Sequence, residues 1–245
     1  MIVFTFYVKL KGELEGEKLI LLITEVTEMS SGNFCVAGWD QQNQRMVRPL
    51  PAGSNWTLGL LTQFGVAPGA TIEFLPSQMH LNGVFPHCTE DTSVDIAHTV
   101  NLNGMPPNWS AAGMPPLYPT VALAFGGNVA HNSQWNGICQ GVYVPVGTLV
   151  NSLSAISISR NSIVFIEEFD NITGVMKLKA VVNDGTLRYK LAVSSALLKS
   201  AWRNGGLPLL QNSLPPGPRF CIRLGLARAF DNPPSRCYMM VNGVH

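Results

Sequence analysis

Turn-forming residues interrupt this sequence every few positions, and this spacing limits the fold more strongly than any other feature of the chain. The 245 residues include 23 Gly and 17 Pro. Few windows keep the three-to-four spacing of apolar residues that marks an amphipathic helix for more than two turns. Short strands joined by turns fit this pattern, so the sequence predicts a mostly β protein.

The last third of the chain carries the clearest strand signals, over residues 162–167, 176–182, 187–192, 220–227 and 236–241. Asp184 and Gly185 predict a hairpin turn between the second and third of these strands, because this pair tolerates the positive φ angles of a type I′ turn. Ser194 is predicted to cap one short helix, and Gly205 and Gly206 to end it. Five strands with a helix between the third and fourth are the order of the OB-fold barrel.

The first third of the chain repeats this order more loosely, with strands predicted over 18–27, 34–39, 45–50 and 70–75. An irregular segment from Ala52 to Pro68 takes the place of the helix. The fold prediction is therefore two OB-like β-barrels with one short helix and an irregular central connection. The N-terminal OB-like domain is expected over 18–90 and the C-terminal one over 158–245. Residues 91–157 are expected to form a connecting region packed on the barrels.

The hairpin in the last third is predicted to have one core face and one basic face. In the register set by the turn, the core face collects Leu178, Ala180, Val182, Leu187, Tyr189 and Leu191. The outer face collects Val181 together with Lys177, Lys179, Arg188 and Lys190. Lys179 would lie directly opposite Lys190, and a bound phosphate chain would relieve their repulsion at the place where OB-folds usually bind nucleic acid. An ordinary solvated face accounts for the same pattern equally well.

Five further side chains are candidates for contact with nucleic acid. Trp39 and Arg48 are predicted to share one face, where a base could stack on the ring and the guanidinium. A Trp buried in the barrel, with Arg48 paired locally, is the alternative that the pattern favours. Arg223 and Arg228 flank the last strands and could hold phosphates or pair with buried carbonyl groups. Tyr238 is the second stacking candidate.

Catalytic signatures are absent from the sequence, which lacks the common motifs of nucleotide-binding, hydrolase and protease sites. The best metal or proton-transfer candidate is the group His87, Glu90 and Asp91, since an imidazole beside two carboxylates can hold a cation. Capping of a loop or helix by Asp91 is the favoured alternative. We therefore expect no cofactor and no catalytic residue, and we do not expect an enzyme.

The charge balance narrows the choice of partner. Sixteen Lys and Arg against fifteen Asp and Glu leave a net charge of +1, so nucleic acid must be held by a local patch. Charged residues make up only 13% and hydrophobic ones 46%, which also suits a surface covered by a protein partner. No apolar run reaches the roughly 18 residues of a membrane span. Five widely spaced cysteines fit a reducing compartment, so we expect a cytoplasmic protein without a membrane partner.

Several short segments resemble one known family. They read MVRPL at 46–50, GATIEF at 69–74, HCTED at 87–91, VNSLSAI at 150–156, FCIRLGLARAF at 220–230 and CYMMVNGV at 237–244. Together they resemble the prokaryotic dual OB domain-containing proteins, from about Lys18 to the C-terminus, with residues 1–17 outside the match. The resemblance implies two OB-like units in a component of a bacterial nucleic-acid-handling or antiviral defence system, acting beside a separate enzyme.

The function predicted from the sequence is a non-catalytic module that binds nucleic acid, in single-stranded form, on the basic hairpin face. Two alternatives stay open. One is a protein-interaction subunit that recruits a partner enzyme. The other is a receptor for a small molecule or a modified nucleotide.

Overall fold

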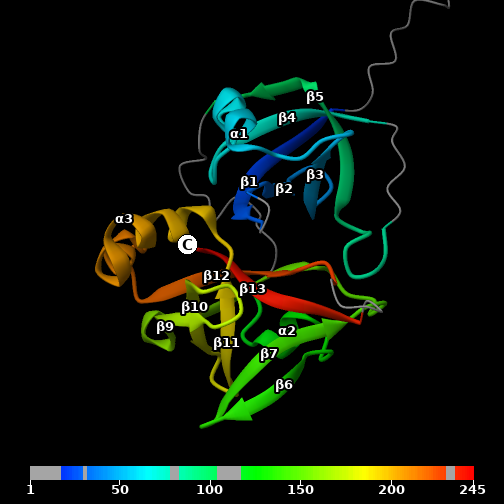
Figure 1. The fold of residues 1–245 in the computed structure, drawn as a ribbon. Helices are drawn as coiled ribbons and strands as arrows, with labels where there is room; N and C mark the ends of the chain where they lie inside the picture. Colours follow the sequence, from blue (N-terminus) through cyan, green and yellow to red (C-terminus); the bar gives the residue numbers. More distant parts are fainter. Residues whose placement is uncertain (1–17, 30–31, 78–82, 104–116, 230–234) are drawn as a thin grey trace, which may run out of the picture.

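The computed structural model describes residues 18–29, 32–77, 83–103, 117–229 and 235–245. These residues form two β bodies, one above the other in Figure 1. Most of the elements are strands and the helices are few, so the expectation of a mostly β protein with two OB-like units is confirmed.

The first body is a closed barrel of five strands in the order β1-β2-β3-β5-β4. The strands are β1 (Leu19–Glu28), β2 (Phe34–Asp40), β3 (Arg45–Pro51), β4 (Thr71–Pro76) and β5 (Asp91–Asn101), and helix α1 (Leu58–Phe64) lies between β3 and β4. Strands β3 and β5 pair in parallel, whereas the other pairs are antiparallel. The four strands predicted in the first third are confirmed, and β5 closes the barrel beyond residue 90.

Helix α1 lies within the segment 52–68 that was expected to be irregular, so that expectation was wrong. Thr57 caps the helix, because its hydroxyl accepts a hydrogen bond from the Leu60 N–H at 3.3 Å. Gly65 ends the helix with a φ of 61°. The helix has seven residues and buries only Leu61, which leaves too short an apolar pattern for recognition from the sequence.

The second body is a sheet of eight strands in the order β8-β12-β13-β7-β11-β10-β9, with β6 paired to β7. Its elements are α2 (Val121–Ala124), β6 (Ala130–Trp135), β7 (Ile138–Pro145), β8 (Leu153–Ser159), η1 (Arg160–Ser162), β9 (Ile163–Asp170), β10 (Val175–Asn183), β11 (Arg188–Val193), α3 (Ala196–Ser213), β12 (Arg219–Leu226) and β13 (Arg236–Val244). The five strands predicted in the last third are confirmed.

The two end strands of this sheet, β8 and β9, are consecutive in the chain and joined only by η1. They act as one bent strand, which pairs with β12 at one end and with β10 at the other. In the first barrel, β1 pairs with β4 and β2 in the same way. The parallel contact between β11 and β13, and the position of α3 before β12, complete a second OB-like unit.

The hairpin of β6 and β7 is an addition to this OB-like unit. Strands β11 and β13 pair only at Ala192–Met240 and Val193–Val241, and β7 lies between them where they separate. The region 91–157, expected to connect the barrels, therefore supplies β5 to the first barrel and β6, β7 and β8 to the second sheet.

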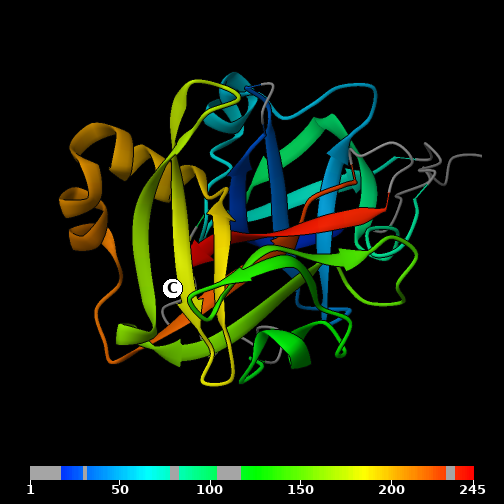
Figure 2. The ribbon, with the colours of Figure 1, turned by 60° about the horizontal axis from the view of Figure 1, so that its bottom comes forward.

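Helix α3 lies at one side of the molecule, next to both bodies (Figures 1 and 2). Ser195 caps it by accepting a hydrogen bond from the Leu198 N–H at 3.4 Å, so the predicted cap at Ser194 was wrong by one residue. Gly205 and Gly206 leave the helical conformation as predicted, but they form a kink after which the helix continues to residue 213.

A buried ion pair joins the two bodies. Arg223 on β12 donates from Nε to Oε1 of Glu25 on β1 at 2.8 Å, and Asn242 on β13 donates from Nδ2 to Oε2 of the same carboxylate at 2.7 Å. The side chains of Arg223 and Glu25 are 0% and 1% exposed. The two charged groups are therefore buried in the interface between the barrels, where they neutralise each other.

Candidate nucleic-acid interface

Strands β9, β10 and β11 present an outward face that carries four basic side chains, Lys177, Lys179, Arg188 and Lys190, and we call it the basic face. Along β10 and β11 these residues alternate with buried ones, among them Leu178, Ala180, Val182, Tyr189 and Leu191. The predicted separation of a core face from a basic face is confirmed for these residues. Leu187 is the exception among the residues predicted for the core face, because 42% of its surface is exposed.

The pairing register of the hairpin differs from the predicted one by two residues. Val181 lies opposite Lys190, and Lys179 lies opposite Ala192, so the predicted pairing of Lys179 with Lys190 was wrong. The cause is Asp184, whose Oδ1 accepts hydrogen bonds from the N–H groups of Thr186 (2.9 Å) and Leu187 (3.0 Å) and so lengthens the turn. A shift by an even number of residues leaves every side chain on its predicted face.

Two carboxylates on β9 neutralise part of the basic face. Glu168 forms a hydrogen bond with Lys190 and lies 3.9 Å from the ammonium of Lys179. Asp170 forms an ion pair with Lys177. Among the described residues Arg188 has no ion-pair partner. Four cations and two carboxylates leave the face with an excess of two positive charges.

The lysines of this face are crowded enough to affect one another. Burial lowers the pKa of Lys179, Glu168 opposes this effect, and the charges of Lys177 and Lys190 lower the pKa further. An anion bound between the lysines would favour their charged forms.

Two shallow hollows lie at the two ends of the basic face. The first, about 380 Å³, is next to the β9–β10 turn and is lined by Glu168, Phe169, Asp170, Asn171, Ile172, Lys177 and Lys179. The second, about 270 Å³, is at the opposite end and is lined by Asn161, Ser162, Val164, Val181, Asn183 and Arg188. Each hollow combines apolar wall atoms with at least one cation.

An exposed tryptophan at the tip of the β6–β7 hairpin was missed in the sequence. Trp135 is 69% exposed, and both it and Arg188 are register partners of Ile138, on opposite sides of β7. The turn consists of Asn136 and Gly137, both with positive φ angles. Asn-Gly between two apolar residues is the standard hairpin signal, and it would have located this arm.

Three of the predicted binding residues are buried between the barrels and do not reach the surface. Trp39 and Met46 of the first barrel pack on Leu153 of the second. Arg48 donates to Oδ1 of Asp91 and to Oγ of Ser152, each at 2.7 Å, and Arg223 binds Glu25 as described above. The alternative is right that both side chains are buried and that Arg48 is paired, but Trp39 lies between the barrels and not in the core of its own barrel, and one of the two partners of Arg48 belongs to the second barrel. The outer face of β2 and β3, where an OB-fold usually binds its ligand, is covered by the second barrel.

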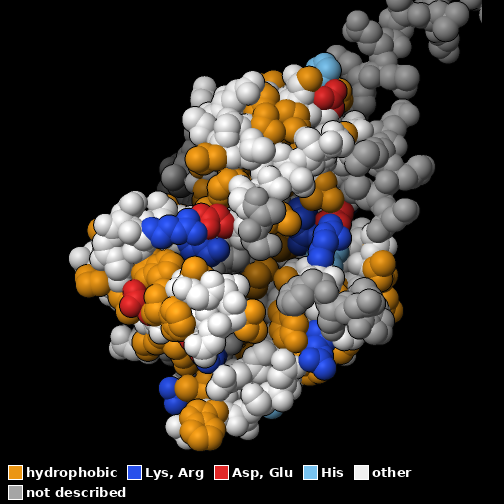
Figure 3. All heavy atoms as spheres, viewed as in Figure 1, with side chains coloured by type: hydrophobic (Ala, Val, Ile, Leu, Met, Phe, Trp, Pro, Cys, Tyr) orange, Lys and Arg blue, Asp and Glu red, His pale blue; other side chains and the backbone are white. Residues whose placement is uncertain are grey.

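The remaining two candidates lie outside the basic face. Arg228, which follows β12, forms an ion pair with Asp91 of the first barrel. Tyr238 on β13 contacts the ring of Tyr143 edge to face, with 5.9 Å between the ring centroids, and its hydroxyl accepts a hydrogen bond from Asn132 at 3.3 Å. Figure 3 shows that basic side chains on this side of the molecule form separate small groups instead of one continuous field.

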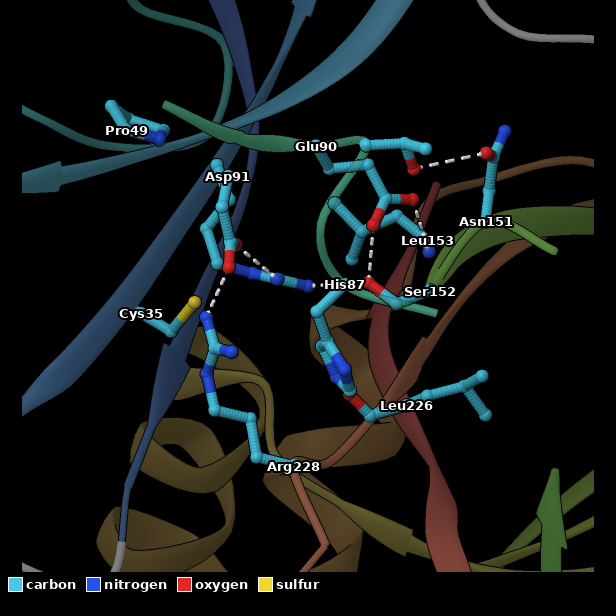
Figure 4. A network of polar contacts seen from close by, with 12 residues as sticks. Cys35, Pro49, His87, Glu90, Asp91, Asn151, Ser152, Leu153, Leu226 and Arg228 are labelled. Atoms are coloured by element: carbon cyan, nitrogen blue, oxygen red, sulfur yellow. Dashed lines mark hydrogen bonds and ion pairs between the residues drawn. The ribbon is translucent and has the colours of Figure 1, made fainter. Parts of the chain in front are cut away.

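His87, Glu90 and Asp91 take part in a polar network between the barrels (Figure 4). Glu90 accepts hydrogen bonds from the Ser152 hydroxyl and from the Leu153 N–H, the latter at 2.9 Å. The ring of His87 lies 2.9 Å, through Nε2, from the carbonyl oxygen of Leu226. Because a carbonyl oxygen can only accept, Nε2 carries the proton in this contact.

The two carboxylates of this network are paired: Asp91 accepts hydrogen bonds from Arg48 and Arg228, and Glu90 accepts them from the Ser152 hydroxyl and the Leu153 N–H. Burial raises the pKa of Glu90 to about 7, although the Arg48 charge and the hydrogen bonds from Ser152 and Leu153 oppose the change. Burial lowers the pKa of His87 to about 4. Within the described ranges no group of His, Cys, Asp and Glu side chains has the arrangement of a metal site.

Comparison with known proteins identifies no family. No family model matches the chain, and no curated protein matches it. Among solved structures the chain is similar to one described as "Structure of murine DNA binding protein bound with ds DNA", with 11% sequence identity and a TM-score of 0.34 over 93% of each chain. A TM-score this low supports no statement about the ligand. In the part of the chain that the structure describes, none of the helices has the length and apolar character needed to cross a lipid bilayer.

Proposed function

We propose that this protein binds single-stranded nucleic acid, without catalysis, on the basic face of its second OB-like unit. The observation that carries the proposal is the set of four cations against two carboxylates on β9, β10 and β11. In the OB order β10 and β11 are the second and third strands, which form the usual ligand face of this fold. The equivalent face of the first barrel is covered, so the second unit offers the free one.

The shape of the face suits a single strand. Phosphates would contact Lys177, Lys179 and Lys190, while bases would enter the two hollows, whose walls include Phe169 and Val164. A net charge of +1 provides no broad field for duplex DNA. A role in a bacterial nucleic-acid-handling or defence system, inside the cytoplasm and beside a separate enzyme, belongs to the same proposal and is supported by the family resemblance alone.

The first test is the salt dependence of binding to a labelled oligothymidylate, measured by fluorescence anisotropy. Contact with two to four phosphates is expected to give a slope of about −1.4 to −2.8 for log K against log salt, at about 0.7 per phosphate for single strands. Binding that is indifferent to salt, or no binding at low salt, would contradict the proposal.

Charge reversal on the basic face provides the second test. The Lys179→Glu/Lys190→Glu variant is expected to weaken binding by roughly tenfold or more, because two charge-assisted contacts are lost. Glu168→Gln is expected to have the opposite effect, roughly two- to fivefold tighter binding, because it releases both lysines from their shared carboxylate. Lys18→Glu/Arg45→Glu on the first barrel is the charge-matched control, and an equal loss in that variant would refute a local site.

The tip of the β9–β10 hairpin favours a second function, recruitment of a protein partner. Four apolar side chains there are between 44% and 95% exposed, namely Phe169, Ile172, Val175 and Met176, and groups of this kind mark protein contacts. Co-purification with wild type and with Ile172→Asp compares the two functions. If the tip binds protein, the variant loses the partner and keeps its oligonucleotide affinity, whereas a charge in the first hollow weakens nucleic-acid binding under the main proposal.

A further inference from the structure

The β6–β7 hairpin places an aromatic ring beyond the usual ligand face of an OB-fold. Trp135 on β6, Ile138 on β7, Arg188 on β11 and Asn183 on β10 are successive register partners across four strands. Register partners project their side chains on the same side of a sheet. The row therefore continues the basic face, through Arg188, onto an arm that the five-strand OB order does not contain.

Trp135 has little apolar surface to pack on at this position. The four preceding residues of β6, from His131 to Gln134, are polar and exposed, and its register partner Ile138 is only half-buried. Exposure of 69% leaves most of the indole available to a ligand. A flat aromatic surface on a two-stranded arm accepts the face of an unpaired base of any identity.

Arg188 supplies the charge that such a ligand requires. Arg188 lines the second hollow, and its guanidinium has no ion-pair partner among the described residues, in contrast to the three lysines of the basic face. Trp135 and Arg188 lie two strand spacings apart, about 9.5 Å between their backbones. Both side chains are long enough to approach one nucleotide placed over Ile138.

We propose that Trp135 and Arg188 form a stacking subsite for one unpaired base and its phosphate, at the end of the strand that crosses the basic face. This subsite rests on the proposed function. It extends the path of the nucleic acid from the β9–β10 turn, across the lysines, to the tip of the β6–β7 arm. The sequence preference at the subsite is weak, because stacking reads no base edge.

The test compares oligothymidylates of about 4 and about 16 nucleotides, the limits of OB-fold site sizes. Trp135→Ala is expected to weaken binding of the long oligonucleotide roughly tenfold, the effect of one stacked base, and to leave the short one unchanged. Trp135→Phe should restore most of the affinity, because a ring is retained. Arg188→Gln should reduce the salt slope for the long oligonucleotide by about 0.7, whereas Trp135→Ala should leave that slope unchanged.

Leu58→Ala serves as the control, since Leu58 is 66% exposed on the first barrel, and circular dichroism confirms that each variant folds. Long-oligonucleotide affinity that survives Trp135→Ala, while Lys179→Glu/Lys190→Glu weakens it, would overturn the subsite and leave the proposed function standing. Equal losses for both lengths would place Trp135 outside a terminal subsite and overturn the proposal. Absence of binding by the wild type would overturn the proposed function and the subsite together.

Discussion

Replacement of Arg223 by alanine is expected to lower the free energy of unfolding by about 3–5 kcal/mol, measured by urea denaturation. The substitution leaves the Glu25 carboxylate at the barrel interface, 1% exposed and without its counter-ion. Among the described residues, the amide of Asn242, at 2.7 Å, is the remaining side chain that donates to it. An unpaired buried charge is far less stable than the same group in water, so the interface between the barrels should loosen.

Two comparisons identify the buried charge as the cause. Glu25→Gln/Arg223→Met removes both charges and keeps an acceptor for Asn242, so it should be closer to wild type than the single variant. Arg203→Ala breaks another contact between the barrels, the pair of 2.6 Å hydrogen bonds from Arg203 to Glu28, but that arginine is 53% exposed. Its loss is expected to cost only about 0.2–1 kcal/mol. A cost for Arg223→Ala no greater than that of Arg203→Ala would refute the argument.

The second large effect is a pH dependence of the free energy of unfolding. In the wild type, opposite contributions from Glu90 and His87 largely cancel it. The folded protein holds Glu90 with a pKa of about 7 against an ordinary value of 4.5. Between these values the folded state keeps a proton that the unfolded state has lost, so the free energy of unfolding falls as the pH rises. This contribution, about 3 kcal/mol, is complete below pH 4.5 and lost above pH 7.

His87 has the opposite sign over nearly the same range. Its pKa falls from 6.5 to about 4 in the folded protein, chiefly through burial. The unfolded state binds a proton that the folded state excludes, so this contribution is complete above pH 6.5 and lost as the pH falls through 4. It also amounts to about 3 kcal/mol. The effects of Glu90 and His87 therefore oppose each other in the wild type.

Glu90→Gln and His87→Gln separate the two effects. Relative to wild type, Glu90→Gln should gain stability from pH 4.5 to 7, because glutamine stays neutral. His87→Gln should gain relative stability from pH 6.5 down to 4, and its amide can still donate to the carbonyl of Leu226. His245, whose pKa is also lowered to about 4, is common to all variants and cancels in these differences. Parallel curves for the three proteins between pH 4 and 8 would contradict both assignments.

The local pattern of the sequence was sufficient for the strands predicted in the first and last thirds of the chain and for the two faces of the β10–β11 hairpin. It did not reveal β5 to β8, which lie in or at the end of the region 91–157 that was expected to connect the barrels. Strands appear where β-prone runs end at turn residues, and alternation places Leu178 and Tyr189 inside with Lys177 and Lys190 outside. The side of a strand depends only on the parity of the position, so it survived the register error of two residues. The register itself depended on hydrogen bonds from the turn to Asp184, which alternation does not report.

The tertiary structure alone decided which outward faces meet solvent. Trp39 and Arg48 point away from the core of their own barrel, as Lys179 does from its own, yet the second barrel covers the first two and leaves the third at the surface. Alternation along a strand distinguishes the two faces of a sheet, but it carries no information about a second domain packed on the outer one. Alternation along β10 and β11 therefore determines that the basic side chains of the second OB-like unit point outward. The packing of the two barrels determines that this face, and not the equivalent face of the first barrel, is exposed to solvent.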